Sequence, residues 1–162
     1  MIEVPLTQGR VALIDDEDAE RVLAYKWHAW WCAKGGRWYA MRTVQVGKLR
    51  RCVRLHRFIV NAPDGVQVDH IDRDSLNNRR SNLRFATHGQ NQTNKKRHRT
   101  NKTGFKGVYW HKAKRTFVAQ VRCGGVTYSL VGFNTAQDAA RARDMLAKRY
   151  HGEFATLNFP AD

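Results

Sequence analysis

The sequence predicts an α+β fold made of two small modules that are joined by a basic linker. Both halves of the chain contain short runs that alternate apolar and polar residues between glycine turns, a pattern typical of antiparallel strands. A helical, alanine-rich segment follows the last of these runs, at residues 136–150. Apolar residues make up 42% of the 162 residues, which is enough for small hydrophobic cores and argues against a disordered chain.

Residues 1–50 predict a β-rich extension that supports the segment after it. A strand is expected at Gly9–Ile14. The acidic run Asp15–Asp18 favours the start of a helix that extends to about Trp27, because helix N-termini attract negative charge. The same four acids could instead bind a metal, but consecutive carboxylates point in different directions, so this interpretation is disfavoured.

A hairpin is expected next, with strands at 27–32 and 38–43 on either side of Lys34–Arg37. The alternating run 51–60 predicts one more strand. Large aromatic side chains are expected to pack the core of this region, namely Trp27, Trp30, Trp31 and Trp38.

Charge is distributed unevenly along the chain. The formal net charge is +15, of which residues 1–40 contribute −1, residues 41–94 contribute +6 and residues 95–162 contribute +10. Such a surplus indicates a polyanionic partner, and nucleic acid is the first candidate. No apolar run approaches the roughly 18 residues that a membrane span needs. The odd, widely spaced cysteines (Cys32, Cys52 and Cys123) favour a reducing cytoplasm over a disulfide framework.

The sharpest basic run divides the chain. Residues 95–102 contain five Lys/Arg and no apolar side chain, so they are expected to be a linker between a domain at 1–94 and a domain at 103–162. The run could be merely solvated. Because basic segments lie on both sides of it, we favour phosphate contacts by four of its cations: Lys95, Lys96, Arg97 and Arg99.

The C-terminal domain is expected to be a three-stranded antiparallel sheet with one packed helix. Strands are predicted at 105–110, 116–122 and 126–133, and Thr135 should cap the helix that follows. Because that helix can cover only one face of the sheet, the other face would display Gln120 and Arg122. A sheet of this size can enter the DNA major groove.

The segment 56–94 is dense in polar side chains suited to chemistry. Asp69-His70 places a hard oxygen ligand beside an imidazole, and Asn82 could fix a long loop by bonding backbone groups. Asn91 would project from a helix that follows Thr87, and a carboxylate with an amide oxygen can hold Mg²⁺. Taken singly, these residues could equally be turn formers and a packed histidine. Histidine spacings without cysteines exclude a zinc finger.

This segment resembles the HNH nuclease motif of phage-type homing endonucleases. The matching residues are LHR at 55–57, VDHID at 68–72, NN at 77–78, NLR at 82–84, and Thr87 followed by Asn91 and Asn94. The resemblance implies a ββα-metal core, here at about 54–94, in which two antiparallel strands and a helix surround one divalent ion.

The resemblance also implies roles for individual residues. Asp69 and Asn91 would hold Mg²⁺ or Mn²⁺, His70 would be the general base, and Asn82 would stabilise the loop that positions it. His56 and Arg57 would orient the site or contact the scissile phosphate. Unperturbed histidine titrates near pKa 6.5, so a neutral imidazole is available around pH 7.

Residues 103–160 resemble the ethylene-response-factor (APETALA-type) DNA-binding domain of plants. The matching residues are GFKGVYW at 104–110, FVAQVR at 117–122, TAQDAARARD at 135–144 and GEFATLNFP at 152–160. In that family the sheet contacts the major groove. The aligned positions in this chain are Lys106, Tyr109, His111, Gln120, Arg122 and Ser129.

The sequence therefore predicts a divalent-metal-dependent, homing-endonuclease-like DNA endonuclease that acts on double-stranded DNA. The alternative is a non-catalytic DNA-binding protein, such as a repressor or architectural factor. The expected protein is a monomer or weak dimer without membrane association, in the cytoplasm of a bacterial or phage-infected cell. A single site per chain would nick DNA as a monomer and cut both strands only as a pair.

Overall fold

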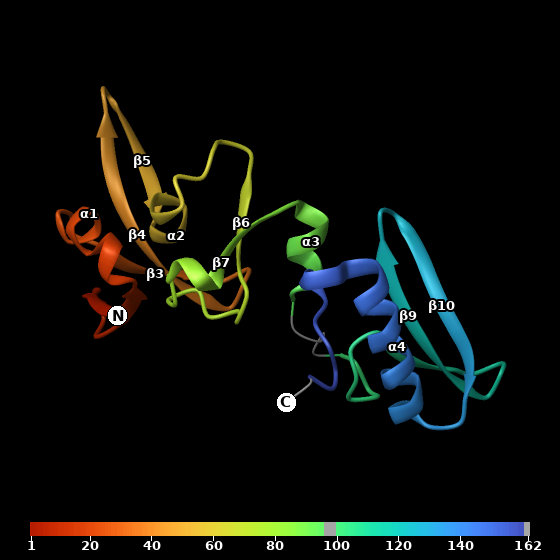
Figure 1. Cartoon of the computed structure of the whole chain (residues 1–162). Helices are drawn as coiled ribbons and strands as arrows, with labels where there is room; N and C mark the ends of the chain where they lie inside the picture. Colours follow the sequence, from red (N-terminus) through yellow and green to blue (C-terminus); the bar gives the residue numbers. More distant parts are fainter. Residues whose placement is uncertain (96–99, 161–162) are drawn as a thin grey trace. The chain divides into compact units, whose positions relative to one another are not determined.

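The computed structural model describes residues 1–95 and 100–160 (Figure 1). The chain forms two compact units, an N-terminal unit at Met1–Thr87 and a C-terminal unit at His88–Asp162. Both are mixed α/β structures with small antiparallel sheets. Lys96, Arg97 and Arg99, three of the four linker cations expected to contact phosphate, lie outside the described residues.

The N-terminal unit contains three small sheets and short helices. A hairpin pairs β1 with β2, a meander has the order β3-β4-β5, and β6 pairs antiparallel with β7. The bounds of its elements are β1 Ile2–Pro5, β2 Val11–Ile14, η1 Asp16–Asp18, α1 Ala19–Leu23, β3 His28–Cys32, β4 Arg37–Val46, β5 Leu49–Arg54, α2 Leu55–Ile59, β6 Gln67–His70, η2 Arg80–Asn82 and β7 Leu83–Ala86.

The core of this unit joins the first hairpin to α2 and the β6–β7 pair. Ile14, Leu55 and Ile59 are fully buried in it, and Trp27 is the only predicted tryptophan that is buried. The expectation for the other three is wrong. Trp30 and Trp31 are exposed, and Trp31 lies beside Trp38 at 5.2 Å between ring centroids, so these rings pack on the surface of the meander.

The single strand expected at 51–60 is instead a strand followed by a helix. β5 ends at Arg54, and α2 begins at Leu55. Leu55 and Ile59 are four residues apart, so a helix directs both to the same face and both become fully buried. The alternation of apolar and polar residues was a coincidence of the short segment.

The helix expected from residue 15 to Trp27 is also shorter. A 3₁₀ turn, η1, is followed by five residues of α1, which ends at Leu23. Asp18 is 1% exposed and accepts two hydrogen bonds of 2.8 Å from the Arg80 guanidinium. One acid of the run therefore ties the N-terminal extension to η2.

The C-terminal unit is a three-stranded antiparallel sheet of order β10-β9-β8, covered on one face by α4. Ala139 and Ala140 of α4 pack against Val108 and Ala119, so small side chains bring helix and sheet close together. Thr135 caps α4 by accepting from the Asp138 amide at 3.1 Å. The bounds are α3 His88–Thr93, β8 Val108–His111, β9 Thr116–Cys123, β10 Val126–Phe133, α4 Ala136–His151 and η3 Gly152–Phe154.

Helix α3 is fastened to the C-terminal unit. Thr93 donates from Oγ1 to the Phe154 carbonyl, and its own carbonyl accepts from Thr156 Oγ1 at 3.1 Å and from Lys106 Nζ. The division between units therefore falls at residue 87/88, whereas the sequence placed the domain boundary after residue 94.

Candidate nuclease site and basic sheet face

Two buried histidines form the centre of the candidate site in the N-terminal unit. His56 comes from the first turn of α2, and His70 is the last residue of β6; each is 4% exposed. Their rings lie edge to face with centroids 4.9 Å apart, and Tyr39 of β4 contacts both rings. The structure thus brings together two residues that the sequence placed fourteen positions apart.

Burial favours the neutral form of both imidazoles. It is the main cause that lowers the pKa of His70 below the ordinary 6.5, against the raising effects of the hydrogen bond from His70 Nε2 to Asn78 Oδ1 and of nearby carboxylates such as Asp72. Burial also lowers the pKa of His56 well below 6.5, and His70, Arg54 and Arg57 add to this effect through charge repulsion.

Asn82 braces the loop that follows His70. Its Oδ1 accepts the Asp72 amide at 2.9 Å, and its Nδ2 donates to Asp72 Oδ1 and to the Asn77 carbonyl. The Asp72 carboxylate also accepts from Asn77 Nδ2. Because Asn82 is 6% exposed, these bonds are shielded from water and fix the course of residues 72–78.

Asn78 fixes the orientation of the His70 ring. Its side chain is 1% exposed, with Oδ1 at 3.3 Å from His70 Nε2. Because Asn78 Nδ2 donates to the Leu76 carbonyl, Oδ1 is the atom turned toward the imidazole, and Nε2 must carry the ring proton. This role was not predicted, although Asn77-Asn78 belongs to the quoted motif.

Asp69 lies beside His70 on β6, and its carboxylate is 7% exposed. Its Oδ2 accepts from Arg84 Nη2 at 2.9 Å and from Arg84 Nε at 3.1 Å, across the β6–β7 pair. Arg84 was quoted in the NLR motif without a role. It holds the carboxylate in a fixed orientation at the end of the strand.

Arg57 is engaged by backbone carbonyls. Its guanidinium donates to Val66, Ala62 and Pro63, the segment that leads into β6. These hydrogen bonds tie α2 to the segment that leads into β6.

Asn91, the second expected metal ligand, is half-buried on α3 and so belongs to the C-terminal unit. Within residues 1–95 and 100–160, no group of three or more His, Cys, Asp or Glu side chains is arranged to hold a metal ion.

The expected DNA-binding residues of the C-terminal unit share one face of its sheet, apart from Lys106, which precedes β8. Ala119 faces α4, so Gln120 and Arg122 point to the opposite face, because side chains alternate along a strand. Residues directly opposite in antiparallel strands share a face. The register therefore places on this open face Tyr109, His111, Gln120, Arg122, Thr127 and Ser129.

Two of the expected DNA-contact residues also have structural partners. Lys106 reaches the carbonyls of Thr93 and Lys95 with its ammonium, so it secures the end of α3. His111 Nδ1 accepts the Lys114 amide at 3.2 Å within the β8–β9 turn. Lys95 itself is exposed.

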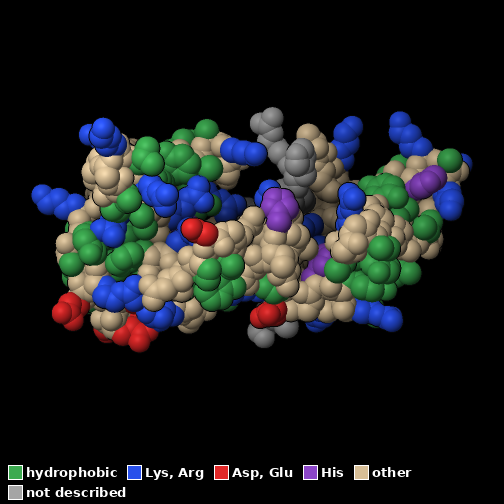
Figure 2. All heavy atoms as spheres, turned by 90° about the horizontal axis from the view of Figure 1, so that it is seen from above, with side chains coloured by type: hydrophobic (Ala, Val, Ile, Leu, Met, Phe, Trp, Pro, Cys, Tyr) green, Lys and Arg blue, Asp and Glu red, His purple; other side chains and the backbone are tan. Residues whose placement is uncertain are grey.

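Positive side chains are abundant on the surface. Figure 2 shows Lys and Arg side chains scattered over the visible face, with acidic side chains in few places. Residues 88–162 carry fourteen Lys/Arg and four Asp/Glu. Among the described residues, no helix is both long and apolar enough to span a membrane.

The N-terminal unit thus holds a buried pair of imidazoles, a fixed carboxylate and an asparagine-braced loop close together, and comparisons with known proteins specify the class of protein. The family model described as HNH endonuclease matches residues 61–93. The chain is 32% identical over 157 residues to a protein named uncharacterized HNH endonuclease L560 of Acanthamoeba polyphaga mimivirus, covering 93% of this chain and 76% of that protein.

Protein 3.8 of Escherichia phage T7 is 30% identical over 102 residues, which cover 57% of this chain and 76% of that protein. No solved structure matches the chain. The chain belongs to the HNH endonuclease family, and it is an enzyme of that class.

Proposed function

We propose that this protein is a divalent-metal-dependent, homing-endonuclease-like enzyme that hydrolyses phosphodiester bonds of double-stranded DNA, with His70 as the general base. The observation that carries the proposal is the buried His56–His70 pair beside the fixed Asp69 carboxylate, in a chain of the HNH family. DNA hydrolysis needs a base near the attacking water and a means to neutralise the charge of the phosphate.

His70 is prepared to accept a proton. Its lowered pKa leaves the ring neutral near pH 7, and the hydrogen bond to Asn78 assigns the ring proton to Nε2. Nδ1 is then the atom that accepts the proton from water. Asn82 acts on His70 indirectly, because it holds the loop that carries Asn78. His56 packs edge to face against His70 and limits its rotation.

The donor chemistry of the site fits a divalent ion. The Asp69 carboxylate is buried and held in place by Arg84, and Asn91 offers an amide oxygen. These are hard oxygen donors, and Mg²⁺ is commonly held by one or two protein ligands together with waters and substrate phosphates. Asp69 and Asn91 would hold the ion, which when bound would stabilise negative charge on the phosphate and the leaving oxygen.

We further propose that β6, β7 and α3 form the ββα-metal core of this family. The strand pair β6–β7 carries Asp69 and His70, and α3 carries Asn91. In this proposal the C-terminal unit is a DNA-binding domain of the ethylene-response-factor type. Its open sheet face would lie in the major groove, with Arg122 and Gln120 toward the bases.

The catalytic proposal is tested by incubating the full chain with supercoiled plasmids that carry libraries of phage or host DNA. Each incubation contains Mg²⁺, Mn²⁺ or EDTA. The wild type should nick DNA only with a divalent ion. His70→Ala should lose at least about a hundredfold in rate, because general-base catalysis contributes about 10²–10⁴-fold.

His28→Ala is a matched control, because it removes a histidine of the same unit that lies on β3 outside the site. Equal nicking by wild type and His70→Ala would overturn the role of His70. DNA binding without nicking under any metal would favour the non-catalytic alternative. For the sheet, Arg122→Ala should weaken DNA binding, and unchanged affinity would contradict the proposed groove contact.

A further inference from the structure

The C-terminal unit contains a hollow beside an unpaired edge of its sheet. β8 pairs with β9 only from His111 to Val108, and the last bond on this edge runs from the Gln120 amide to the Gly107 carbonyl at 2.8 Å. Among the described residues, no strand continues along the rest of β9. The hollow that results has a volume of about 820 Å³ and lies between β9, α3 and the end of α4.

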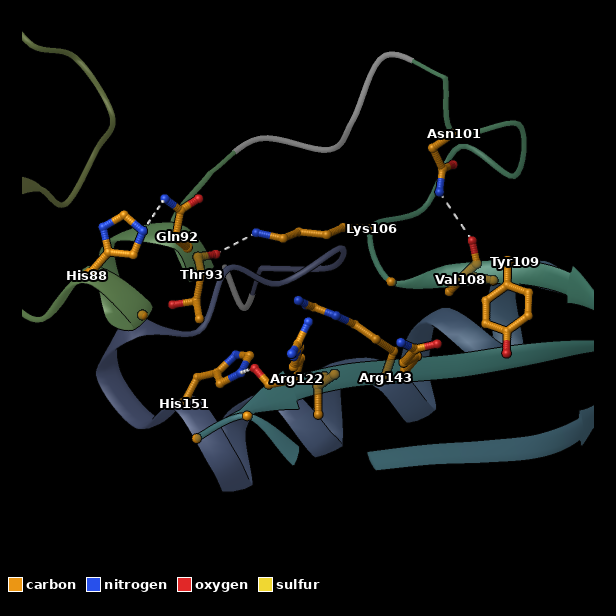
Figure 3. Close-up of a pocket in the computed structure, with 16 residues that line it drawn as sticks. His88, Gln92, Thr93, Asn101, Lys106, Val108, Tyr109, Arg122, Arg143 and His151 are labelled. Atoms are coloured by element: carbon orange, nitrogen blue, oxygen red, sulfur yellow. Dashed lines mark hydrogen bonds between the residues drawn. The ribbon is translucent and has the colours of Figure 1, made fainter. Parts of the chain in front are cut away.

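The lining of the hollow is cationic. Lys106, Arg122 and Arg143 contribute three positive charges, His88 and His151 contribute imidazoles, and no carboxylate of the described part of the chain lines it. Figure 3 shows Arg122, Arg143 and His151 along one wall, while Lys106 reaches across toward Thr93 of α3. Such a concentration of one sign of charge in a concave site favours an anion.

Two polar atoms of this wall have no partner among the described residues. Arg143 is 3% exposed, and its Nε makes no hydrogen bond, although its Nη1 donates to Asp144 and to the Thr156 carbonyl. His151 bonds the Arg122 carbonyl through Nε2, while its buried Nδ1 is unsatisfied. Buried donors normally find partners, so an incoming acceptor would compensate Arg143 Nε. Because His151 Nε2 donates to the Arg122 carbonyl, His151 Nδ1 can donate to such an acceptor only when the ring takes up a second proton.

The positive charges around the hollow also affect the pKa of His151. Burial is the first cause that lowers its pKa, and the charges of Arg143 and Lys106 lower it further. An anion seated near these two cations would offset their repulsion.

We propose that the hollow is a phosphate-binding subsite that holds a phosphodiester of the bound DNA backbone. Tyr109, Gln120 and Arg122 belong both to its lining and to the open sheet face, so a strand that crosses this face passes the mouth of the hollow. The unit that contains it has a net charge of +10. This inference rests on the proposed DNA binding of the sheet and adds Arg143, His151 and the rim of α3 to it.

The first test removes a charge from the wall. Arg143→Met should lower affinity for a fluorescent DNA duplex roughly fivefold to tenfold, measured by anisotropy in EDTA with the full chain. The loss should be similar for unrelated duplex sequences. The slope of log affinity against log salt should become shallower by about 0.9, the value for one phosphate contact. Lys148→Met, which removes one charge from the same helix outside the hollow, should leave the slope unchanged.

A second variant avoids the buried core, because Arg143→Met could unfold the unit. Gln92 is exposed on α3 at the rim, so Gln92→Glu places a negative charge there without a change of shape. It should weaken duplex binding and flatten the salt dependence. Gln90→Glu is the isosteric control on the same helix, outside the lining, and should bind as the wild type does.

Free anions distinguish the source of the phosphate. Inorganic phosphate and a mononucleotide are titrated into the wild type while thermal unfolding and DNA binding are followed. DNA binding that depends on Arg143 and Gln92, with weak competition by free phosphate, supports the proposal. Saturable binding of the free anions while both variants bind DNA normally would overturn it and indicate a small-anion site.

If the wild type binds duplex and Gln92→Glu binds it identically, the subsite is wrong while the proposed DNA binding stands. If the wild type binds no duplex at any salt concentration, the proposed DNA binding fails and the subsite fails with it. Nicking assays with His70→Ala are independent of both results, because binding is measured in EDTA.

Discussion

The two units differ in how many of their polar side chains they bury. The N-terminal unit buries them: His56, His70, Asn78 and Asn82 are each less than a tenth exposed and bond or pack against one another. The C-terminal unit builds its core from alanine and valine, and apart from the buried Arg143–Asp144 pair its described charged side chains are half-buried or exposed. Groups that must move a proton need fixed positions, whereas affinity for a polyanion needs only accessible charge, so the buried network is the more sensitive to substitution.

The largest expected effect concerns the ion pair that ties the N-terminal extension to η2. Arg80→Met leaves the Asp18 carboxylate, which is 1% exposed, without its main partner. We expect a loss of about 3–5 kcal/mol in the free energy of unfolding, the cost of breaking a buried pair. Denaturant titration of the N-terminal transition measures it.

Replacement of the other member of the pair, Asp18, provides the control. Asp18→Asn should cost less, because the Arg80 side chain is 41% exposed and water can solvate the guanidinium. Equal losses in the free energy of unfolding for Arg80→Met and Asp18→Asn would contradict the explanation that the cost comes from leaving the buried Asp18 carboxylate without a partner.

In the C-terminal unit the most sensitive position is a backbone contact. A Cβ added to Gly107 would lie 2.5 Å from the Gln120 carbonyl oxygen, and the residue has φ +70°. Gly107→Ala should therefore cost about 2–3 kcal/mol through overlap and backbone strain. Gly104 has φ +82° and no atom near its Cβ position, so Gly104→Ala measures the cost of backbone strain without overlap. A Gly104→Ala loss as large as that of Gly107→Ala would contradict the close-approach explanation.

Asn78 should affect activity more than stability. Asn78→Ala removes the bond that assigns and orients the His70 ring, and loss of such a supporting group typically costs about 10–100-fold in rate. Asn78→Asp restores an acceptor oxygen and should recover part of the rate. Its added negative charge favours protonated His70, so the acidic limb of the rate profile should move to higher pH. An unshifted profile for Asn78→Asp would argue against a direct effect on the base.

Acid should destabilise the N-terminal unit before the C-terminal one. Burial lowers the pKa of both His56 and His70 in the folded chain, so the unfolded chain binds more protons below the ordinary value of 6.5. Stability is therefore retained above that pH and falls as the pH decreases toward the lowered values. Among the described residues of the C-terminal unit, one histidine, His151, has a lowered pKa, and it is less buried. Calorimetry between pH 7 and 5 should show a larger fall in the unfolding temperature of the N-terminal unit than in that of the C-terminal unit. His56→Gln should make the fall for the N-terminal unit smaller.

Strands, turns and the alanine-lined helix were predictable because they depend on short-range patterns. The alternation in β9 and the cap at Thr135 are both found in the structure. The α2 helix was missed because five residues are too few to separate a period of two from a period of 3.6.

Site residues were predictable only as far as the motif named them. His56 and His70 meet through packing of α2 against the rest of the unit, which no spacing reveals. Asn78 and Arg84 stood in the motif, but their roles depend on which atom of a neighbour they face. The partners of α3 come from residues 106, 154 and 156, far along the chain, so a boundary drawn from linker composition could not assign it.

The smallest expected effect tests that assignment of α3. Thr156→Val keeps the shape of the side chain and removes the hydroxyl that bonds the Thr93 carbonyl, a loss of about 1 kcal/mol. Global unfolding should barely change, whereas amide exchange along α3 should become faster. Thr127→Val, on the exposed face of β10, should leave α3 unaffected. Unchanged exchange in Thr156→Val would mean that the C-terminal unit does not hold this helix. Faster exchange together with slower nicking would show that the unit proposed to bind DNA also steadies the helix that carries Asn91, so that the division between cutting and binding runs through α3 itself.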